Sequence, residues 1–492
     1  MTMKKVSGDL AKNRDYLDRQ LGVGESFDVL YRNVEIGKKN AALYMIDGFC
    51  KDEVMQKLLQ HFIGITKEQM PEDAAEMSRQ LVPYGGGLGR AADAGRLCDD
   101  LDEICRQVMS GVTALLLEGY EQGILIDART YPARSVGEPE KDKVLRGSKD
   151  GFVETIVFNT ALIRRRIRST QLRMEMLQAG KTSHTDIVLC YMEDRVDQQF
   201  LEKIRNRIQN LQVDALTLNQ ESLAECLYQG RWWNPFPKFR FSERPDTAAA
   251  QVLEGNIIIL VDNSPSALIT PTSLFDVLEE ADDYYFPPIT GTYLRLSRLL
   301  IAIVTYFLTP TFLLLMEYPQ WIPKGFEFIA VRDTVYIPLI WQLLLLELAI
   351  DGLKLAAVNT PNMLSTPLSV LNWTWDYRAL SVMAALVLGE FSVKSGWFNS
   401  EVMLYMAFVA VANYTQNSLE LGYALKFMRI INLVLTAIFG VWGYVGGIVI
   451  LAVSLLFNRT VSSRSYLYPL VPFHGKQLGH QLFRTRLPAA RK

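Results

Sequence analysis

The sequence predicts an α/β soluble head of two subdomains, followed by a polytopic α-helical membrane domain. Charged residues make up 21% of the 492-residue chain, yet only 16 of the 160 residues at positions 299–458 are charged. The first 290 residues instead alternate short β-type apolar runs with helical apolar spacings, as mixed α/β domains do. No apolar run of the kind that opens a signal peptide occurs in residues 1–20, so we expect the head to stay in the cytoplasm.

Composition excludes several functional classes. A net charge of −2 is unsuited to a dedicated nucleic-acid binder, which needs a basic excess. The five cysteines are odd in number, lie before residue 230 and show no CxxC spacing, so we expect reduced thiols. The four histidines are scattered and no hydrolase or Walker motif occurs. We therefore expect no enzyme activity, no cofactor and no metal site.

The head divides at a charged linker, residues 138–143. Residues 1–25 are expected to form a polar N-terminal tail, and residues 26–137 and 144–290 to form cytoplasmic α/β subdomains 1 and 2. In subdomain 1 we expect a strand pair, two helices and a hairpin, at 27–49, 51–65, 101–109 and 112–130. In subdomain 2 we expect a helix, a strand, a helix, a strand and a hairpin, at 151–168, 185–192, 198–211, 213–218 and 251–270.

A short internal echo links the subdomains. LEG at 117–119 precedes ILID at 124–127, and LEG at 253–255 precedes ILVD at 259–262. The echo predicts two related strand–turn–strand elements, one in each subdomain.

Residues 291–458 are expected to form the membrane domain with four to six spans. Candidate apolar segments are found at 299–316, 334–358, 380–391, 402–419 and 430–458. The last has 29 uncharged residues and four glycines, so we expect two helices broken at the glycines. Residues 459–492 contain seven basic and no acidic residues, which predicts a cytoplasmic tail on the same side as the head.

Polar residues within the apolar region are the main candidate site. Glu347, Asp351 and Lys354 are spaced i, i+4 and i+7 and share one helix face. Charges in hydrocarbon must face protein, water or each other. The three residues are therefore ion-path candidates, with the alternative that Asp351 and Lys354 pair near an interface and Glu347 makes a helix contact.

A second candidate is a basic interaction patch, formed by Arg164, Arg165, Arg166 and Arg168 at a predicted helix end. Basic residues near a helix C-terminus are favoured by the helix dipole and are commonly just solvated. The alternative is contact with membrane lipid headgroups or an acidic partner.

Several motifs resemble the A subunits of spore germinant receptors. They are DGFVET at 150–155, NTALIRR at 159–165, PFP at 235–237, ERPD at 243–246, DDYY at 282–285 and YLYPL at 466–470. The resemblance implies a multi-pass protein of the spore inner membrane, with its head on the core side. It also implies a homo-oligomeric ring, for which a pentamer is one option, that releases ions and amplifies germination. Implied partners are a small membrane protein and other germination receptor complexes, but not nucleic acid. Residues 371–382 look like an insertion relative to that family.

Three functions follow from these observations. The first is an oligomeric ion channel that releases cations during germination, favoured by the resemblance and the charged helix face. The second is a secondary transporter, favoured by the polar, proline-containing segment 359–367. The third is a non-conducting membrane scaffold for a germination complex, in which the charged residues are only structural.

Overall fold

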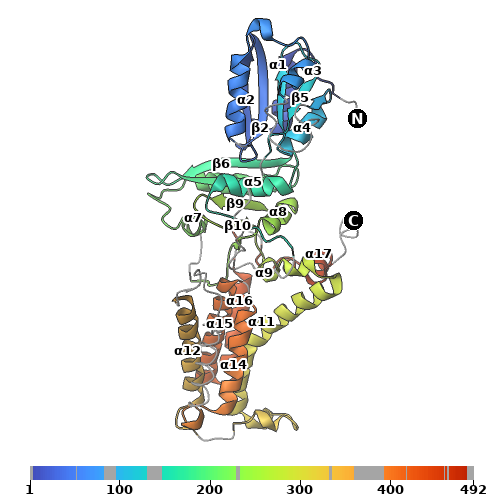
Figure 1. Cartoon of the computed structure of the whole chain (residues 1–492). Helices are drawn as coiled ribbons and strands as arrows, with labels where there is room; N and C mark the ends of the chain where they lie inside the picture. The colour runs from blue at the N-terminus through green and yellow to red at the C-terminus, as the bar shows by residue number, and fades with distance from the viewer. Residues whose placement is uncertain are drawn as a thin grey trace, which may run out of the picture. The chain divides into compact units, whose positions relative to one another are not determined.

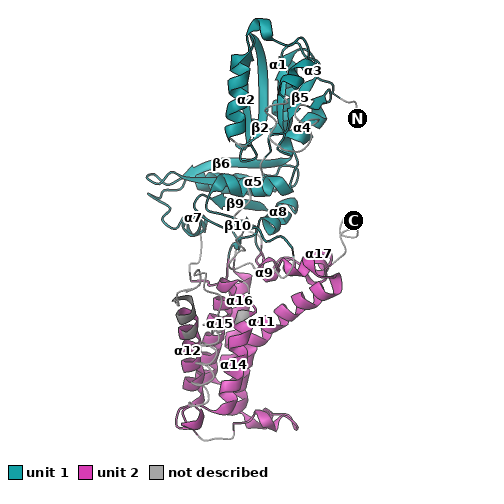
Figure 2. Ribbon diagram, in the orientation of Figure 1, with its two compact units in different colours: residues 1–230, 238–272, 460–464 teal, residues 231–237, 273–459, 465–492 magenta. Residues whose placement is uncertain are grey.

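The computed structural model describes residues 4–50, 52–81, 96–129, 147–228, 233–331, 335–359, 393–416, 418–458, 460–462 and 465–484. The chain forms two compact units, which Figure 2 colours separately. Unit 1 contains residues 1–230, 238–272 and 460–464, and unit 2 contains residues 231–237, 273–459 and 465–492. Every strand of the described chain belongs to unit 1, and unit 2 is helical.

The first half of unit 1 is an antiparallel sheet of order β1-β2-β4-β5-β3 with helices on both faces (Figure 1). The predicted strand pair and hairpin are confirmed, since β1 pairs with β2 and β4 pairs with β5. The strands are β1 (Val29–Ile36), β2 (Lys39–Ile46), β3 (Arg96–Cys98), β4 (Thr113–Leu117) and β5 (Gly123–Ile126). The helices are α1 (Leu10–Leu21), α2 (Asp52–Gly64), α3 (Ala74–Leu81) and α4 (Leu101–Met109).

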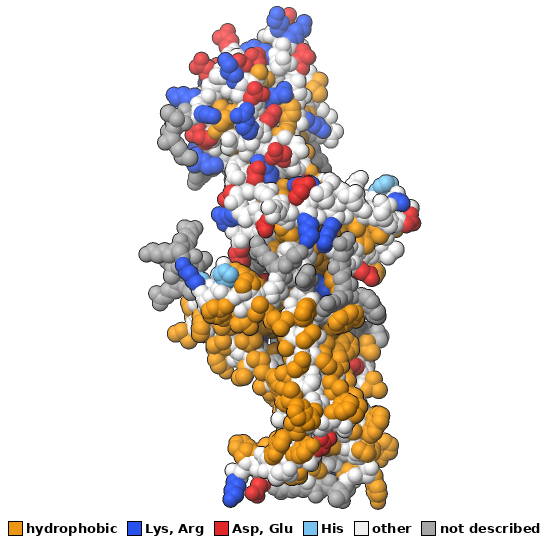
Figure 3. Space-filling model, turned by 180° about the vertical axis from the view of Figure 1, so that it is seen from behind, with side chains coloured by type: hydrophobic (Ala, Val, Ile, Leu, Met, Phe, Trp, Pro, Cys, Tyr) orange, Lys and Arg blue, Asp and Glu red, His pale blue; other side chains and the backbone are white. Residues whose placement is uncertain are grey.

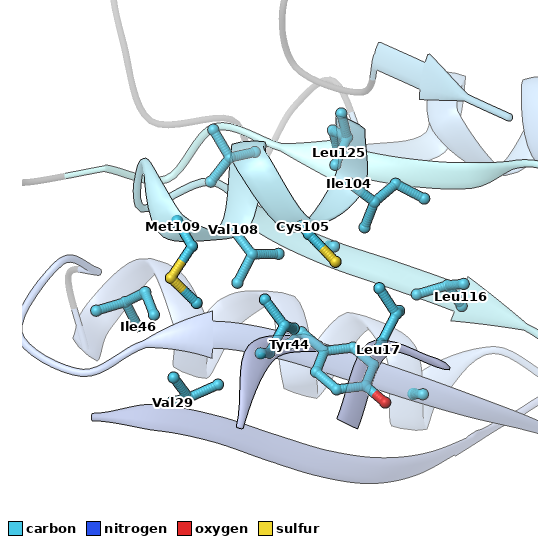
Figure 4. Close-up of a cluster of buried hydrophobic side chains, with 14 of the residues drawn as sticks. Leu17, Val29, Tyr44, Ile46, Ile104, Cys105, Val108, Met109, Leu116 and Leu125 are labelled. Carbon is cyan, nitrogen blue, oxygen red and sulfur yellow. The ribbon is translucent and has the colours of Figure 1, made fainter. Parts of the chain in front are cut away.

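Alternation along β2 explains the two layers of helices. Successive strand residues point to opposite faces of a sheet. Tyr44 and Ile46 therefore join the core beneath α1 and α4, shown in Figure 4, whereas Leu43 and Met45 join the core beneath α2 and α3. The Tyr44 hydroxyl donates a hydrogen bond of 2.7 Å to Asp18 on α1, which satisfies the polar end of a buried ring.

The N-terminal residues are not a separate polar tail. Asp9 caps α1 by accepting hydrogen bonds from the amides of Ala11 and Lys12. Leu10, Leu17 and Leu21 of α1 are at most 6% exposed and lie in the core of the first sheet. The polar residues between them occupy the solvent side, which is why composition alone suggested a tail.

The second half of unit 1 repeats this architecture. Its sheet has the order β6-β7-β9-β10-β8, with α5 and α8 on one face and α6 and α7 on the other. The strands are β6 (Leu172–Ala179), β7 (Thr185–Met192), β8 (Arg240–Ser242), β9 (Ile257–Val261) and β10 (Ala267–Thr270). The helices are α5 (Ile156–Arg166), α6 (Gln198–Gln209), α7 (Gln220–Leu227) and α8 (Pro245–Leu253).

Matching details extend the repeat beyond strand order. Asn13 in α1 and Asn159 in α5 each bond both backbone groups of the residue six positions earlier. Gly111 after α4 and Gly255 after α8 have φ values of 91° and 95° and end their helices in the same way. These matching features show that α1 corresponds to α5 and α4 to α8. The two halves of unit 1 are therefore two copies of one α/β fold.

The repeated LEG motif predicts the wrong correspondence between the elements of the two halves. Two related strand–turn–strand elements exist, β4–β5 and β9–β10, but the first LEG ends β4 whereas the second ends α8. The predicted strand at 185–192 is confirmed, and the predicted helix at 151–168 begins only at Ile156. The predicted strand at 213–218 is wrong because those residues are turn and coil, and the strand beside β7 is instead β6.

Unit 2 consists mainly of apolar helices. Two described helices are long and apolar enough to cross a membrane, α11 (Pro288–Glu317) and α15 (Leu419–Phe439). The other main helices are α12 (Leu339–Asn359), α14 (Ser400–Tyr414) and α16 (Val441–Leu456). Short helices α9 (Leu274–Leu278), α10 (Asp282–Tyr285) and α17 (Gly475–Leu482) also belong to this unit. Three predicted features, the apolar segment 380–391, the polar segment 359–367 and the insertion 371–382, are outside the described residues apart from the backbone of Asn359. The count of four to six spans therefore stays a prediction.

The predicted break within the last apolar segment is confirmed. Gly440 has a φ of 56° and separates α15 from α16. The two helices then pack closely, because a Cβ at Gly443 would lie 1.8 Å from the Leu435 carbonyl oxygen and one at Gly447 would lie 2.3 Å from Asn432 Oδ1. Small residues at such a contact let two helix backbones approach each other.

We expect Gly443→Ala to destabilise unit 2 by about 1–3 kcal/mol, because its methyl group meets backbone that cannot move aside. Gly446→Ala is the matched control, since nothing lies within 4 Å of a Cβ there. Urea unfolding in detergent, followed by tryptophan fluorescence, measures both. Equal stability of the two variants would contradict the close contact.

Candidate functional site

The most distinctive feature of unit 2 is a cluster of charges buried among apolar helices. Glu347 on α12 is 2% exposed, while Lys426 and Arg429 on α15 are 4% and 0% exposed. The two acidic residues of α12, Glu347 and Asp351, are spaced i, i+4, and the basic residues of α15 are spaced i, i+3. Each pair therefore occupies one helix face, and the two faces meet.

Glu347 is the centre of this cluster. Its Oε1 accepts hydrogen bonds from Arg429 Nε at 2.8 Å and lies 2.6 Å from Arg429 Nη2. Lys426 Nζ lies 3.5 Å from Glu347 Oε2 and donates to the Glu347 backbone carbonyl at 2.9 Å. A carboxylate shared by two cations avoids much of the desolvation cost of an isolated charge.

The cluster also reaches the neighbouring helices. Arg429 Nη1 donates to the Thr305 carbonyl of α11 at 3.2 Å. One helical turn further along α15, buried Asn432 donates to the Tyr306 hydroxyl at 3.2 Å. The charged and polar side chains thus connect α11, α12 and α15.

The three predicted ion-path residues have different surroundings. Glu347 is enclosed and paired, whereas the Asp351 side chain is 27% exposed and forms an ion pair with Lys426. Lys354 Nζ lies 5.5 Å from the centre of the Tyr423 ring. Asp351 thus contacts a lysine of α15, a partner that the spacing of the α12 residues did not indicate.

Sequence reasoning missed Lys426 and Arg429. Both were counted among the charges of the apolar region, but they lie between the predicted segments 402–419 and 430–458. The sequence did contain a signal for them. Two basic residues at helical spacing in an apolar stretch have the opposite charge to the two acidic residues of α12, and buried charges need such partners.

A second charged cluster surrounds the beginning of α11. Arg295 and Arg298 are 7% and 8% exposed, and both contact Asp283, which is fully buried. Arg295 also pairs with Glu279 at 2.8 Å, and Arg298 with Glu280 at 2.7 Å. The two arginines are thus held by three acidic residues at the beginning of α11.

The four arginines of the predicted basic patch do not share one surface. Arg164 is fully buried and pairs with Asp28 through Nε at 2.8 Å and Nη2 at 3.0 Å, which joins the two halves of unit 1. Arg166 pairs with Asp150 at 2.6 Å. Burial alone would raise the pKa of Asp150, but hydrogen bonds from Arg166 and Ser148 hold it below its usual value. Arg164 therefore cannot belong to a surface patch, and of the four arginines only Arg165 and Arg168 are exposed.

The fold and site define a class: a protein with a two-sheet α/β unit and an apolar helical unit that has charges at its centre. The model of the Bacillus/Clostridium GerA spore germination protein family matches residues 15–492, and the chain belongs to this family. It is 36% identical over 488 residues to Stage V sporulation protein AF of Bacillus subtilis (strain 168), which covers 99% of this chain and 94% of that protein. It is 24% identical over 487 residues to Spore germination protein KA of the same organism, which covers 98% of this chain and 85% of the relative.

A solved structure also matches. It is the N-terminal domain of the A subunit of the Bacillus megaterium spore germinant receptor GerK3, with 25% identity and a TM-score of 0.42. The match covers 55% of this chain and 97% of that domain.

We expect Glu347→Gln to destabilise unit 2 by about 3–5 kcal/mol, because it leaves two buried cations with too little negative charge. Asp351→Asn should lower the free energy of unfolding by less than about 1 kcal/mol, because Asp351 is partly exposed and Lys426 still has Glu347 as a partner. Unfolding in detergent measures both. A Glu347→Gln variant as stable as Asp351→Asn would contradict the central role of Glu347.

We expect Arg164→Leu to destabilise unit 1 by about 3–5 kcal/mol, since Asp28 would remain buried without its partner. Arg165→Leu, at the exposed neighbouring position, should change stability by less than about 0.5 kcal/mol. Urea unfolding followed by circular dichroism compares them. The ion pair is unimportant if both variants unfold at the wild-type urea concentration.

Proposed function

We propose that this chain is a membrane-embedded, receptor-like subunit of spore germination, and that it assembles into an oligomeric channel releasing cations and amplifying the response. Membership of the GerA family supports the role in germination. The proposed location is the spore inner membrane, with unit 1 on the core side. A small membrane protein and other germination receptor complexes are its proposed partners.

The distribution of polarity in unit 2 supports membrane embedding. Figure 3 shows hydrophobic side chains gathered over the surface of this unit. Ile438, Trp442 and Leu404 are 65%, 84% and 68% exposed, whereas Arg429 and Asn432 are fully buried. Apolar residues outside and polar residues inside fit lipid surroundings, where polar groups must be satisfied within the protein.

The charge cluster supports an ion path beside it. The two carboxylates and two cations of the cluster are equal in number, and Asp351 is its more exposed carboxylate. A carboxylate that is held in place and reached by water favours cations over anions. We therefore assign Asp351 the largest effect on conduction, with Glu347 holding the helices that position it.

The non-conducting scaffold is the second candidate. It is favoured by the pairing of Glu347 with both Arg429 and Lys426, because a carboxylate neutralised in this way contributes little field to a pore. In that case the cluster would only hold the helices together, and the chain would organise other germination proteins.

We expect Asp351→Asn to lower potassium flux several-fold in vesicles containing the purified chain, since it removes the negative charge of the more exposed carboxylate of the cluster. Glu317→Gln, which neutralises an exposed carboxylate at the end of α11, is the matched control and should conduct normally. Native mass measurement in detergent shows whether each variant remains oligomeric. A monomeric wild type, or no wild-type flux, would favour the scaffold. Normal flux in Asp351→Asn would remove Asp351 from the ion path.

A further inference from the structure

Helix α11 is too long for a membrane. Its 30 residues span about 45 Å at 1.5 Å per residue, whereas a hydrocarbon core is about 30 Å thick. Roughly ten residues must therefore lie beyond the hydrocarbon. Residues 299–316 of α11 are uncharged, whereas both of its arginines, Arg295 and Arg298, lie near its N-terminus, so we place the N-terminal end outside the hydrocarbon.

The surface of this N-terminal end is nevertheless apolar. Ile289, Tyr293 and Leu296 are 86%, 69% and 38% exposed. Leu300 and Ile303 follow at 61% and 48%, so spacings of four, three, four and three place all five on one face of α11. One apolar stripe thus runs from the apolar part of the helix to its polar end without interruption.

A second apolar segment is attached beside this end. Helix α17 is held against α11 by Arg295 Nη1, which donates to the Gln481 carbonyl at 2.6 Å, and by the Arg484 amide, which donates to Thr292 Oγ1 at 3.1 Å. Phe473 and Phe483, on either side of α17, are 70% and 54% exposed. These contacts make α17 a fixed part of unit 2, with its flanking aromatic residues facing outward.

The charged residues of this attached segment are all basic. Residues 465–484 contain no aspartate or glutamate, and Lys476, His474 and His480 are exposed. Exposed aromatic rings beside an exposed lysine suit the boundary of a bilayer with anionic headgroups. A protein partner would have to cover a stripe that continues directly into the lipid-facing part of α11.

We propose that residues 288–296 and 470–484, here called the shoulder, lie in the headgroup layer of an anionic phospholipid leaflet. The inference rests on the membrane placement of unit 2 proposed above. The apolar side chains of the shoulder enter the boundary between headgroups and acyl chains, and Lys476 contacts lipid phosphates. The shoulder thereby sets the depth at which α11 leaves the membrane.

Site-specific fluorescence quenching tests this placement. Ile289→Cys, Phe483→Cys, Val449→Cys and Leu218→Cys are each labelled with an environment-sensitive fluorophore, with serine replacing the partly exposed Cys50, Cys98 and Cys226. Cys105 and Cys190 remain, because both are buried and burial raises the pKa of the Cys105 thiol to about 12. The full chain is reconstituted in vesicles of phosphatidylglycerol and phosphatidylcholine. These contain lipids spin-labelled either near the glycerol or near the acyl-chain end.

The labelled positions separate this inference from the proposed function. We expect probes at 289 and 483 to be quenched at least two-fold more by the shallow spin label than by the deep one. The probe at Val449, on α16, should show the reverse, and the probe at Leu218, in unit 1, should respond to neither. If the Val449 probe is unquenched, the membrane placement itself fails. If only the shoulder probes are unquenched, the shoulder is not at the lipid boundary and our inference is wrong.

Two further outcomes decide the occupant and the role of charge. Shoulder probes shielded from lipid only at high protein-to-lipid ratio would identify a second copy of the chain and overturn the proposal.

Lys476→Glu should lower shallow quenching at 483 at least two-fold in phosphatidylglycerol-containing vesicles and little in phosphatidylcholine alone. Lys181→Glu, an exposed lysine of unit 1, is the matched control and should change neither. Equal quenching in both lipids would overturn the anionic requirement.

Discussion

The structure of unit 2 depends on one constraint: a charge among apolar helices needs a partner of opposite sign. Glu347 meets it with Arg429 and Lys426, and Arg429 also reaches the backbone of α11. In the membrane placement proposed above, apolar burial would not drive these helices together, because lipid acyl chains are as apolar as the side chains. The ion pairs therefore specify which faces of α11, α12 and α15 meet. The glycine contacts between α15 and α16 then add the fourth helix to this frame.

Unit 1 reaches a defined structure by a different route. Two copies of one α/β fold each bury both faces of a sheet, and they are joined by the bidentate ion pair of Arg164 with Asp28 and by an ion pair of Arg173 with Glu25 at 3.1 Å. Backbone bonding reinforces this junction, since the Phe27 amide donates to the Met174 carbonyl at 3.0 Å. The bulk of the stabilisation is apolar burial within each copy, and these polar contacts select how the copies meet.

Local pattern predicted much of this fold. Strand β7, the hairpin β4–β5 and the helix break at Gly440 follow from alternation, turn residues and glycine, which act over a few residues. The repeat did not follow, because the visible LEG echo aligned β4 with α8 instead of with β9. The true correspondence is carried by hydrogen bonds of Asn13 and Asn159, which depend on side-chain geometry rather than on similar sequence. For the same reason, the sequence indicated Glu347 and Asp351 but not the distant residues that pair with them.

The pairing of α12 with α15 has a consequence for how the protein is made. Arg429 is 82 residues further along the chain than Glu347. At about 5–20 residues per second, a ribosome takes roughly 4–16 s to add it. During that interval a newly made α12 carries its carboxylates without their eventual partners. If unit 2 inserts in a membrane as we propose, α12 has to wait at the insertion machinery or in the polar headgroup region until α15 emerges. The two helices then enter the bilayer as a pair, so biogenesis of this protein is governed by its later half.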